Sequence, residues 1–331
     1  MTKVLSFLGV YANLFLMILS NDIFAGSEAI YPSNLLQLDD KFTHHILVVE
    51  KATHKLFLFK NKDGVPQLEK EFQTATGKNP GNKFTEGDKK TPEGIYQLNR
   101  FYDAAYLVKT YNEYGKIYGA GAFVLDYPNV LDKRESKSGD GIWLHSTDDE
   151  SRISKGLDTR GCVVLNDANL KEVAQYIDLD AKTEMIIVEN LNYWNESTWK
   201  KNKLTALKTV TDWMKSWNDA NINSYLSFYS RSEFKDNNGK NYTQWADHKT
   251  RVFKTVKATS IKMRFLSLKK FNDYVYASFE QDYTSSAIVD TGRKYLILKP
   301  DENYNLKIVY EGWESLKQFR EIAFTPSQRF F

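Results

Sequence analysis

Residues 159–166 read Thr-Arg-Gly-Cys-Val-Val-Leu-Asn and contain Cys162, the single cysteine of this 331-residue chain. Upstream, residues 141–145 read Gly-Ile-Trp-Leu-His, a short apolar stretch typical of a buried strand that ends on His145. A thiol is largely protonated near neutral pH, and a histidine that removes its proton creates a nucleophilic thiolate. Where two such stretches meet in a fold, they form a Cys–His nucleophile pair, and Gly161 leaves room for a substrate beside it.

The amino-acid composition excludes several kinds of site for this protein. One cysteine excludes an intramolecular disulfide and a cysteine-cluster zinc site. Cys162 is therefore an inert buried thiol, half of an intermolecular bridge, or a nucleophile. Histidines do not supply a zinc site either, because His44 and His45 point to opposite faces of a strand, and His54 and His248 fall in predicted turns. We expect no metal and no cofactor. With 45 basic and 42 acidic residues, the charge is also too balanced to indicate nucleic-acid binding.

The N-terminus indicates export. Lys3 precedes a mostly apolar run over residues 4–19, which is shorter than the roughly 20 residues of a membrane span. This pattern predicts a signal peptide over residues 1–25, cleaved after Ala25, with Ala29 as the second choice. The expected location is the periplasm. The alternatives are an uncleaved membrane anchor and a buried N-terminal helix.

At roughly 150 residues per domain, the length predicts about two domains. A connector over residues 26–43, which could pack against a second copy in a homodimer, leads into a β-rich domain over 44–190. A separate α+β domain is expected over 200–331, because helices come first and strands follow. Predicted strands of the first domain are 46–50, 55–60, 70–76, 94–98, 141–145 and 184–189, with one helix starting near 167 and an exposed charged loop over 130–140. The second domain is expected to hold helices over 204–217 and 222–229, then strands over 256–268, 274–283, 293–298 and 306–313.

The Cys–His motifs resemble the L,D-transpeptidase (YkuD-like) catalytic domain family, whose pattern is a histidine, a short variable segment and Ser/Thr-x-Gly-Cys. Thr76-Gly77-Lys78 and the Lys-Thr-Pro-Glu-Gly-Ile-Tyr stretch at 90–96 also match that family's Thr-Pro-x-Gly strand start. The resemblance runs from about His45 to Glu189 and implies a β-rich YkuD-like fold, mixed β with few helices.

Carried over by position, the resemblance assigns a role to each motif residue. Cys162 is the acyl-accepting thiolate, and His145 is its base and later its acid. The backbone carbonyl of Ser146 would orient the imidazole. Thr159 matches the small hydroxyl residue three positions before the cysteine, and Gly161 with Cys162 would contact the oxyanion.

Four more residues of this region are candidates. Arg160 lies inside the motif and is expected to belong to the catalytic site. Trp143, Asn166 and Tyr118 are expected to contact the substrate. The tyrosine-rich stretch that contains Tyr118, residues 101–127, fits either an aromatic wall or ordinary sheet.

One departure from the family pattern concerns the reaction. Transpeptidases of this family usually carry arginine two positions after the cysteine, where this chain has Val164. The sequence is more similar to the cell-shape L,D-carboxypeptidases of curved and helical Gram-negative bacteria. That resemblance implies hydrolysis of peptidoglycan stem tetrapeptides to tripeptides, with loss of the terminal D-alanine, unless Val164 is a neutral change. The alternatives are an L,D-transpeptidase and a non-catalytic protein that binds the wall or its glycan.

The second domain resembles an NTF2-like cone, a set of helices followed by a curved four-stranded sheet. Such cones often hold a pocket, here expected to take a carbohydrate or another small ligand. The residues expected to line it are Trp245, Arg264, Tyr283 and Trp313. Large aromatic side chains of this kind more often belong simply to a hydrophobic core.

Overall fold

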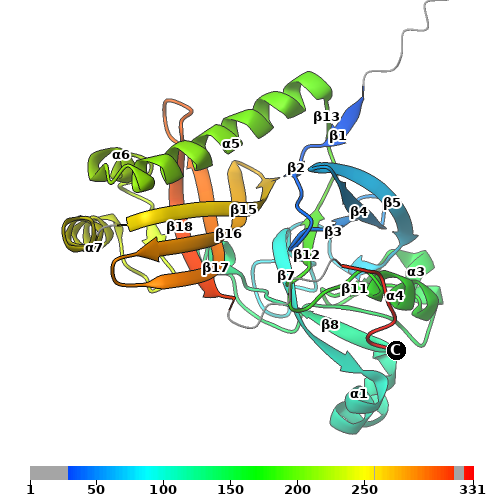
Figure 1. Ribbon diagram of the computed structural model, residues 1–331. Coiled ribbons are helices and arrows are strands. Elements are labelled where there is room, and N and C mark those ends of the chain that lie inside the picture. Colours follow the sequence, from blue (N-terminus) through cyan, green and yellow to red (C-terminus); the bar gives the residue numbers. More distant parts are fainter. Residues whose placement is uncertain (1–28, 257, 317–323) are drawn as a thin grey trace, which may run out of the picture.

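The computed structural model describes residues 29–256, 258–316 and 324–331. The predicted signal peptide at 1–25 lies outside these residues. Two lobes lie side by side, a mixed sheet with short helices and a curved sheet with longer helices (Figure 1). No helix among the described residues is long and apolar enough to span a membrane.

The first lobe is built on an eight-stranded sheet in the order β11-β9-β8-β7-β12-β3-β4-β5. Its strands are β3 (His45–Glu50), β4 (Lys55–Lys62), β5 (Val65–Gln73), β7 (Gly94–Asp103), β8 (Gly121–Leu125), β9 (Trp143–His145), β11 (Val163–Val164) and β12 (Glu184–Val188). A small parallel pair, β6 (Thr76–Gly77) with β10 (Leu157–Thr159), lies beside them. The helices are α1 (Ala104–Tyr111), the 3-10 helix η1 (Asn112–Tyr118), α2 (Val130–Arg134), α3 (Ser151–Lys155) and α4 (Asp167–Ala174).

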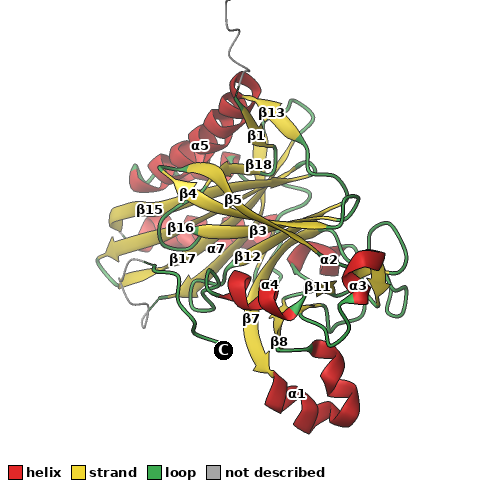
Figure 2. Cartoon of the chain, turned by 90° about the vertical axis from the view of Figure 1, so that its right-hand side faces the viewer, coloured by secondary structure: helices red, strands yellow, loops and turns green. Residues whose placement is uncertain are grey.

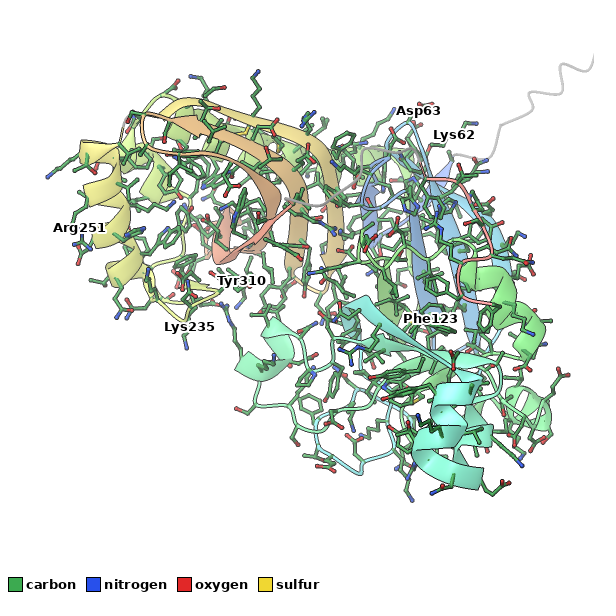
Figure 3. The ribbon with its side chains drawn as sticks, turned by 60° about the horizontal axis from the view of Figure 1, so that its bottom comes forward. Lys62, Asp63, Phe123, Lys235, Arg251 and Tyr310 are labelled. Atoms are coloured by element: carbon green, nitrogen blue, oxygen red, sulfur yellow. The ribbon has the colours of Figure 1, made fainter. Side chains whose placement is uncertain are left out.

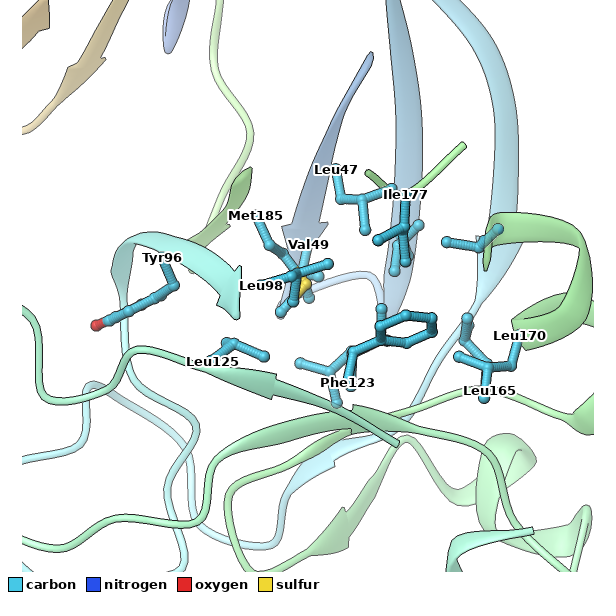
Figure 4. Packing of buried hydrophobic residues seen from close by; sticks show 14 of the residues in the cluster. Leu47, Val49, Tyr96, Leu98, Phe123, Leu125, Leu165, Leu170, Ile177 and Met185 are labelled. Carbon is cyan, nitrogen blue, oxygen red and sulfur yellow. The ribbon is translucent and has the colours of Figure 1, made fainter. Parts of the chain in front are cut away.

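The central strands are apolar on both faces because both faces of the sheet are covered. Leu47 and Val49 of β3 join a core beneath α4 (Figure 4), whereas Ile46 and Val48 join a second core on the other face. A strand buried on both faces appears in the sequence as a continuous apolar run. The predicted strands in this domain are all present, apart from shifts at their ends.

The second lobe is a curved sheet in the order β14-β18-β17-β16-β15-β2. Its four long strands are β15 (Ala258–Phe271), β16 (Tyr274–Ser285), β17 (Val289–Pro300) and β18 (Leu306–Ser315), with the short β14 (Lys235–Asp236) at one edge. The helices are α5 (Glu196–Asn218), α6 (Ile222–Ser227) and α7 (Tyr242–Thr255). The helices-then-strands order is confirmed, but the turn predicted at His248 is wrong, since this residue lies in α7.

The connector is part of the fold. β1 (Ile30–Pro32) pairs with β13 (Tyr193–Asn195), and β2 (Leu35–Gln37) extends the curved sheet beside β15. Leu35 and Leu36 are fully buried within the chain. These side chains are covered by their own chain, and packing of the connector against a second copy stays a prediction.

The exposed loop predicted over residues 130–140 is wrong in part. Residues 130–134 form α2, and nearby Asp132 and Lys137 make a buried ion pair of 2.8 Å instead of facing solvent. The tyrosine-rich stretch contains α1 and η1, and α1 lies beyond the end of β7 (Figure 2).

Candidate active site

Two neighbouring parallel strands bring Cys162 and His145 to one face of the sheet. β11 pairs with β9 so that Val163 lies opposite Leu144 and Val164 opposite His145. Side chains alternate along a strand, and Leu144 and Val163 both point into the core. Cys162 precedes Val163 and His145 follows Leu144, so both side chains point away from that core and face the same side of the sheet. Cys162 immediately precedes β11 and is half-buried there.

The imidazole of His145 is held in one tautomer. Its Nδ1 lies 2.5 Å from the backbone oxygen of Ser146. A carbonyl oxygen only accepts hydrogen bonds, so Nδ1 carries the proton and Nε2 keeps a free lone pair. Burial lowers the pKa of His145 to about 4, partly opposed by the Ser146 carbonyl. The ring is therefore neutral near pH 7 and able to accept a proton at Nε2.

The thiol of Cys162 is also neutral at rest. Burial raises its pKa, and the backbone N–H of Trp143 and the positive charge of Arg160 offset only part of that effect. Sγ lies 3.4 Å from the Gly141 carbonyl oxygen, to which the thiol donates. A neutral thiol and a neutral imidazole on one face of the sheet suit transfer of the thiol proton to Nε2 during nucleophilic attack.

Thr159 shapes the turn that carries the nucleophile. Its hydroxyl donates to the Cys162 carbonyl at 2.7 Å and accepts from the Gly161 N–H at 3.0 Å. Gly161 has φ +132°, and a Cβ there would lie 2.8 Å from the Lys90 carbonyl oxygen, so the position requires glycine. The oxyanion contact expected from Gly161 is corrected, because its N–H is already bound. That contact falls to the Cys162 N–H, for which the described residues provide no hydrogen-bond acceptor.

Aromatic and basic side chains surround the pair. The Tyr118 ring lies 4.9 Å from the His145 ring and 5.0 Å from the Trp143 ring. Burial, followed by the proximity of Cys162, raises the pKa of Tyr118 to about 12. The Arg160 guanidinium donates to the Tyr114 hydroxyl and stacks 5.6 Å from that ring. The described residues give it no ion pair with a carboxylate, and its positive charge acts on the Cys162 thiol.

Asn166 has a structural role at the start of α4. Its side-chain oxygen accepts from the Asn169 N–H at 2.7 Å and caps α4. The substrate contact predicted for this residue stays a prediction. Sequence reasoning missed Arg152, whose Nη1 lies 3.3 Å from the Thr147 hydroxyl and whose charge further lowers the pKa of His145. It also missed Tyr114. Neither belongs to a motif, although Tyr114 lies within the tyrosine-rich stretch.

The four residues expected to line a pocket in the second domain lie on four different elements, and three of them are close to Trp217 or to a lysine that contacts it. Trp245 is in the core on α7, and Tyr283 packs 5.8 Å from Trp217. Arg264 forms ion pairs with Glu280 and Asp282 at the surface. Trp313 lines a cavity of about 410 Å³ between the two lobes, which also includes Tyr310 (Figure 3). The Lys249 ammonium lies 4.5 Å from both the Trp217 and the Trp245 ring, and the Lys294 ammonium lies 5.7 and 5.3 Å from the Trp217 and Trp313 rings. A shared ligand pocket in this domain stays a prediction. Among the described residues no group of three or more His, Cys, Asp and Glu could hold a metal.

Comparison with known proteins agrees with this architecture. Residues 44–188 match the L,D-transpeptidase catalytic domain, YkuD, and residues 205–312 match the Cds6 C-terminal NTF2-like domain. The chain belongs to the family of L,D-transpeptidase-type proteins that carry a C-terminal NTF2-like domain.

Two solved structures resemble nearly the whole chain. Bd1075 of Bdellovibrio bacteriovorus matches with a TM-score of 0.74 and 30% identity, covering 88% of this chain and 100% of that one. The helical cell shape determining protein Pgp2 of Campylobacter jejuni matches with a TM-score of 0.65 and 27% identity, covering 85% of this chain and 95% of that one. A search of curated proteins gives no match.

Proposed function

We propose that this protein is a peptidoglycan L,D-carboxypeptidase, which removes the terminal D-alanine from stem tetrapeptides. The observation that carries the proposal is the placement of Cys162 beside a neutral His145 whose Nε2 is free to act as a base. This arrangement suits acyl transfer through a thioester.

Acylation begins when Nε2 of His145 takes the thiol proton as Sγ of Cys162 attacks the carbonyl carbon between meso-diaminopimelate and D-alanine. The Cys162 N–H stabilises the oxyanion of the tetrahedral intermediate. His145 then gives the proton to the leaving amine, the C–N bond breaks, and D-alanine departs. A thioester to Cys162 remains.

In deacylation, water is the nucleophile and the sulfur of Cys162 is the leaving group. His145 accepts a proton from water, the hydroxyl oxygen attacks the thioester carbon, and the proton passes to sulfur as the C–S bond breaks. The products are a tripeptide and the free thiol. The same thioester would give a cross-link if an amine took the place of water.

The environment of Val164 favours water as the acceptor. Its side chain is fully buried, and its backbone exchanges two hydrogen bonds of 2.9 Å with Ala75. Position 164 therefore offers no cation to an incoming acceptor. Arg160, for which the described part of the chain shows no carboxylate partner, suits the free carboxylate of a terminal D-alanine.

A role in cell shape follows from the same proposal. Pgp2 is described as a helical cell shape determining protein. Such an enzyme must reach the wall, and the signal peptide predicted at residues 1–25 would export it to the periplasm.

Incubation with defined tetrapeptide muropeptides tests the reaction. Wild-type protein is expected to release D-alanine and tripeptide, and Cys162→Ala, confirmed as folded by its thermal unfolding, is expected to release neither. Peptide dimers or exchange of D-amino acids would identify a transpeptidase instead. A Cys162→Ala protein that restores the wild-type muropeptide profile in cells would identify a non-catalytic wall-binding protein.

A further inference from the structure

Five tyrosines form a continuous surface that starts at the catalytic histidine. This tyrosine platform consists of Tyr102 at the end of β7, Tyr106 and Tyr111 on α1, and Tyr114 and Tyr118 on η1. Its members contact one another or share Trp143 as a neighbour. Tyr102 stacks on Tyr106 at 4.6 Å, and Tyr111 and Tyr114 lie 6.0 and 6.3 Å from Tyr118. Tyr102 and Tyr111 lie 5.8 and 6.3 Å from the Trp143 ring.

The outer part of the platform is exposed. Tyr106, Tyr111 and Tyr114 are 46%, 40% and 47% accessible, whereas α1 buries only Leu107. α1 projects from the first lobe on the side away from the curved sheet (Figure 1), so the second lobe does not cover these rings. Clustered exposed aromatic side chains mark binding surfaces, whereas scattered ones need no explanation.

We propose that the tyrosine platform binds the glycan to which the stem peptide is attached, so that the enzyme selects sugar-linked tetrapeptides over free ones. This inference rests on the proposed carboxypeptidase function. A sugar ring presents a C–H face and a rim of hydroxyls. Tyrosine offers a complementary apolar ring and a polar tip at low conformational cost.

The distances fit this occupant. Three residues of a stem peptide separate the scissile bond from the glycan, a span of roughly 10 Å when extended. The centre of the Tyr118 ring lies 4.9 Å from that of His145 and 6.0 Å from that of Tyr111. The path from His145 through Tyr118 to Tyr111 is therefore of similar length. With the scissile carbonyl at Cys162 and the stem peptide extended toward Tyr111, the attached sugar reaches the exposed rings of α1. Tyr114 instead holds Arg160, the cation assigned to the D-alanine carboxylate.

A glycan held here contributes to catalysis although it does not react. Binding energy from a remote part of a substrate can be used to position the reacting bond, so substrates that lack that part lose efficiency. The platform therefore predicts a higher kcat/KM for the disaccharide-linked tetrapeptide than for the free tetrapeptide.

The test measures kcat/KM of the full chain on both substrates. Wild type is expected to prefer the linked tetrapeptide by about tenfold or more, and Tyr106→Ala/Tyr111→Ala is expected to reduce that preference at least about fivefold. Tyr106→Phe/Tyr111→Phe keeps the rings and is expected to keep most of the preference. Tyr193→Ala serves as the control, because Tyr193 is 42% exposed but lies on β13, far from α1 in Figure 1.

A second measurement uses wild type alone and so does not depend on folding of the variants. Excess free disaccharide is expected to raise KM for the linked tetrapeptide and to leave KM for the free tetrapeptide unchanged. Equal efficiency on both substrates, a preference that survives in the double alanine variant, or no effect of free disaccharide overturns the inference and leaves the carboxypeptidase function intact. Failure to cleave either tetrapeptide overturns the proposed function itself.

Discussion

At the scale of single residues, the protonation states of Cys162 and His145 decide how the pair works. Both groups are buried enough to be neutral, and the Ser146 carbonyl fixes the imidazole proton on Nδ1. The motif alone predicts an activated thiolate, because it gives the residue types without their burial. The structure instead favours a base that acts during attack.

The pH dependence of activity follows from the lowered pKa of His145. The imidazole is a base only when unprotonated, and its pKa of about 4 keeps it unprotonated from neutral pH down to about pH 5. We expect kcat/KM on tetrapeptide to stay flat on its acid side until about pH 5 and to fall about tenfold per pH unit below pH 4. Circular dichroism at each pH separates this loss from unfolding. An acid limb centred near pH 6.5 would contradict the buried neutral base.

At the scale of elements, Asn166 at the start of α4 has two possible roles when the sequence alone is considered. Asn166 follows directly after the catalytic motif, which favours a substrate contact, and it also stands where a helix begins. The structure assigns its side-chain oxygen to the Asn169 N–H, so the helix cap is the role that it performs. The sequence predicted the helix correctly. The hydrogen bond of the Asn166 side chain, however, depended on the backbone conformation at the start of that helix.

Substitution of the cap is expected to affect stability. Asn166→Ala leaves the first turn of α4 without its side-chain acceptor and is expected to lower the free energy of unfolding by about 1 kcal/mol. Asn166→Asp keeps an acceptor at the same place and is expected to restore most of that loss. Urea unfolding measures both variants. A large increase in KM for tetrapeptide at unchanged stability in Asn166→Ala would support the substrate contact predicted for this residue.

At the scale of the whole molecule, a buried ion cluster joins the two lobes. Glu184 of β12 accepts from Lys269 of β15 and lies 3.5 Å from Nη2 of Arg293 on β17. The side chains are 1–5% exposed, and Arg293 also donates to the Ala181 carbonyl at 2.7 Å. Together with the connector strand β2, this cluster makes the interface between the lobes part of the folded core.

Removal of Glu184 is expected to be costly because it leaves two buried cations without their carboxylate. Glu184→Ala is expected to lower the free energy of unfolding by about 3–5 kcal/mol, measured by urea unfolding. Asp212→Ala is the matched control, since it breaks an exposed ion pair with Lys208 on α5 and is expected to change stability by about 0.5 kcal/mol or less. Equal effects of the two substitutions would show that the cluster does not stabilise the interface.

The sequence by itself determined the features that depend on local pattern. Apolar runs predicted the strands of both domains, and the spacing of His145, Thr159 and Cys162 identified the family. Only the tertiary structure decided how those residues are used. The parallel pairing of β9 with β11 put the nucleophile and base on one face, and burial set their pKa values. Contacts between residues distant in sequence moved the connector into the core, bound the Gly161 N–H to Thr159 and exposed the tyrosines of α1. Local sequence sets backbone preference and residue chemistry, but burial and hydrogen-bond partners come from segments that meet only in the fold.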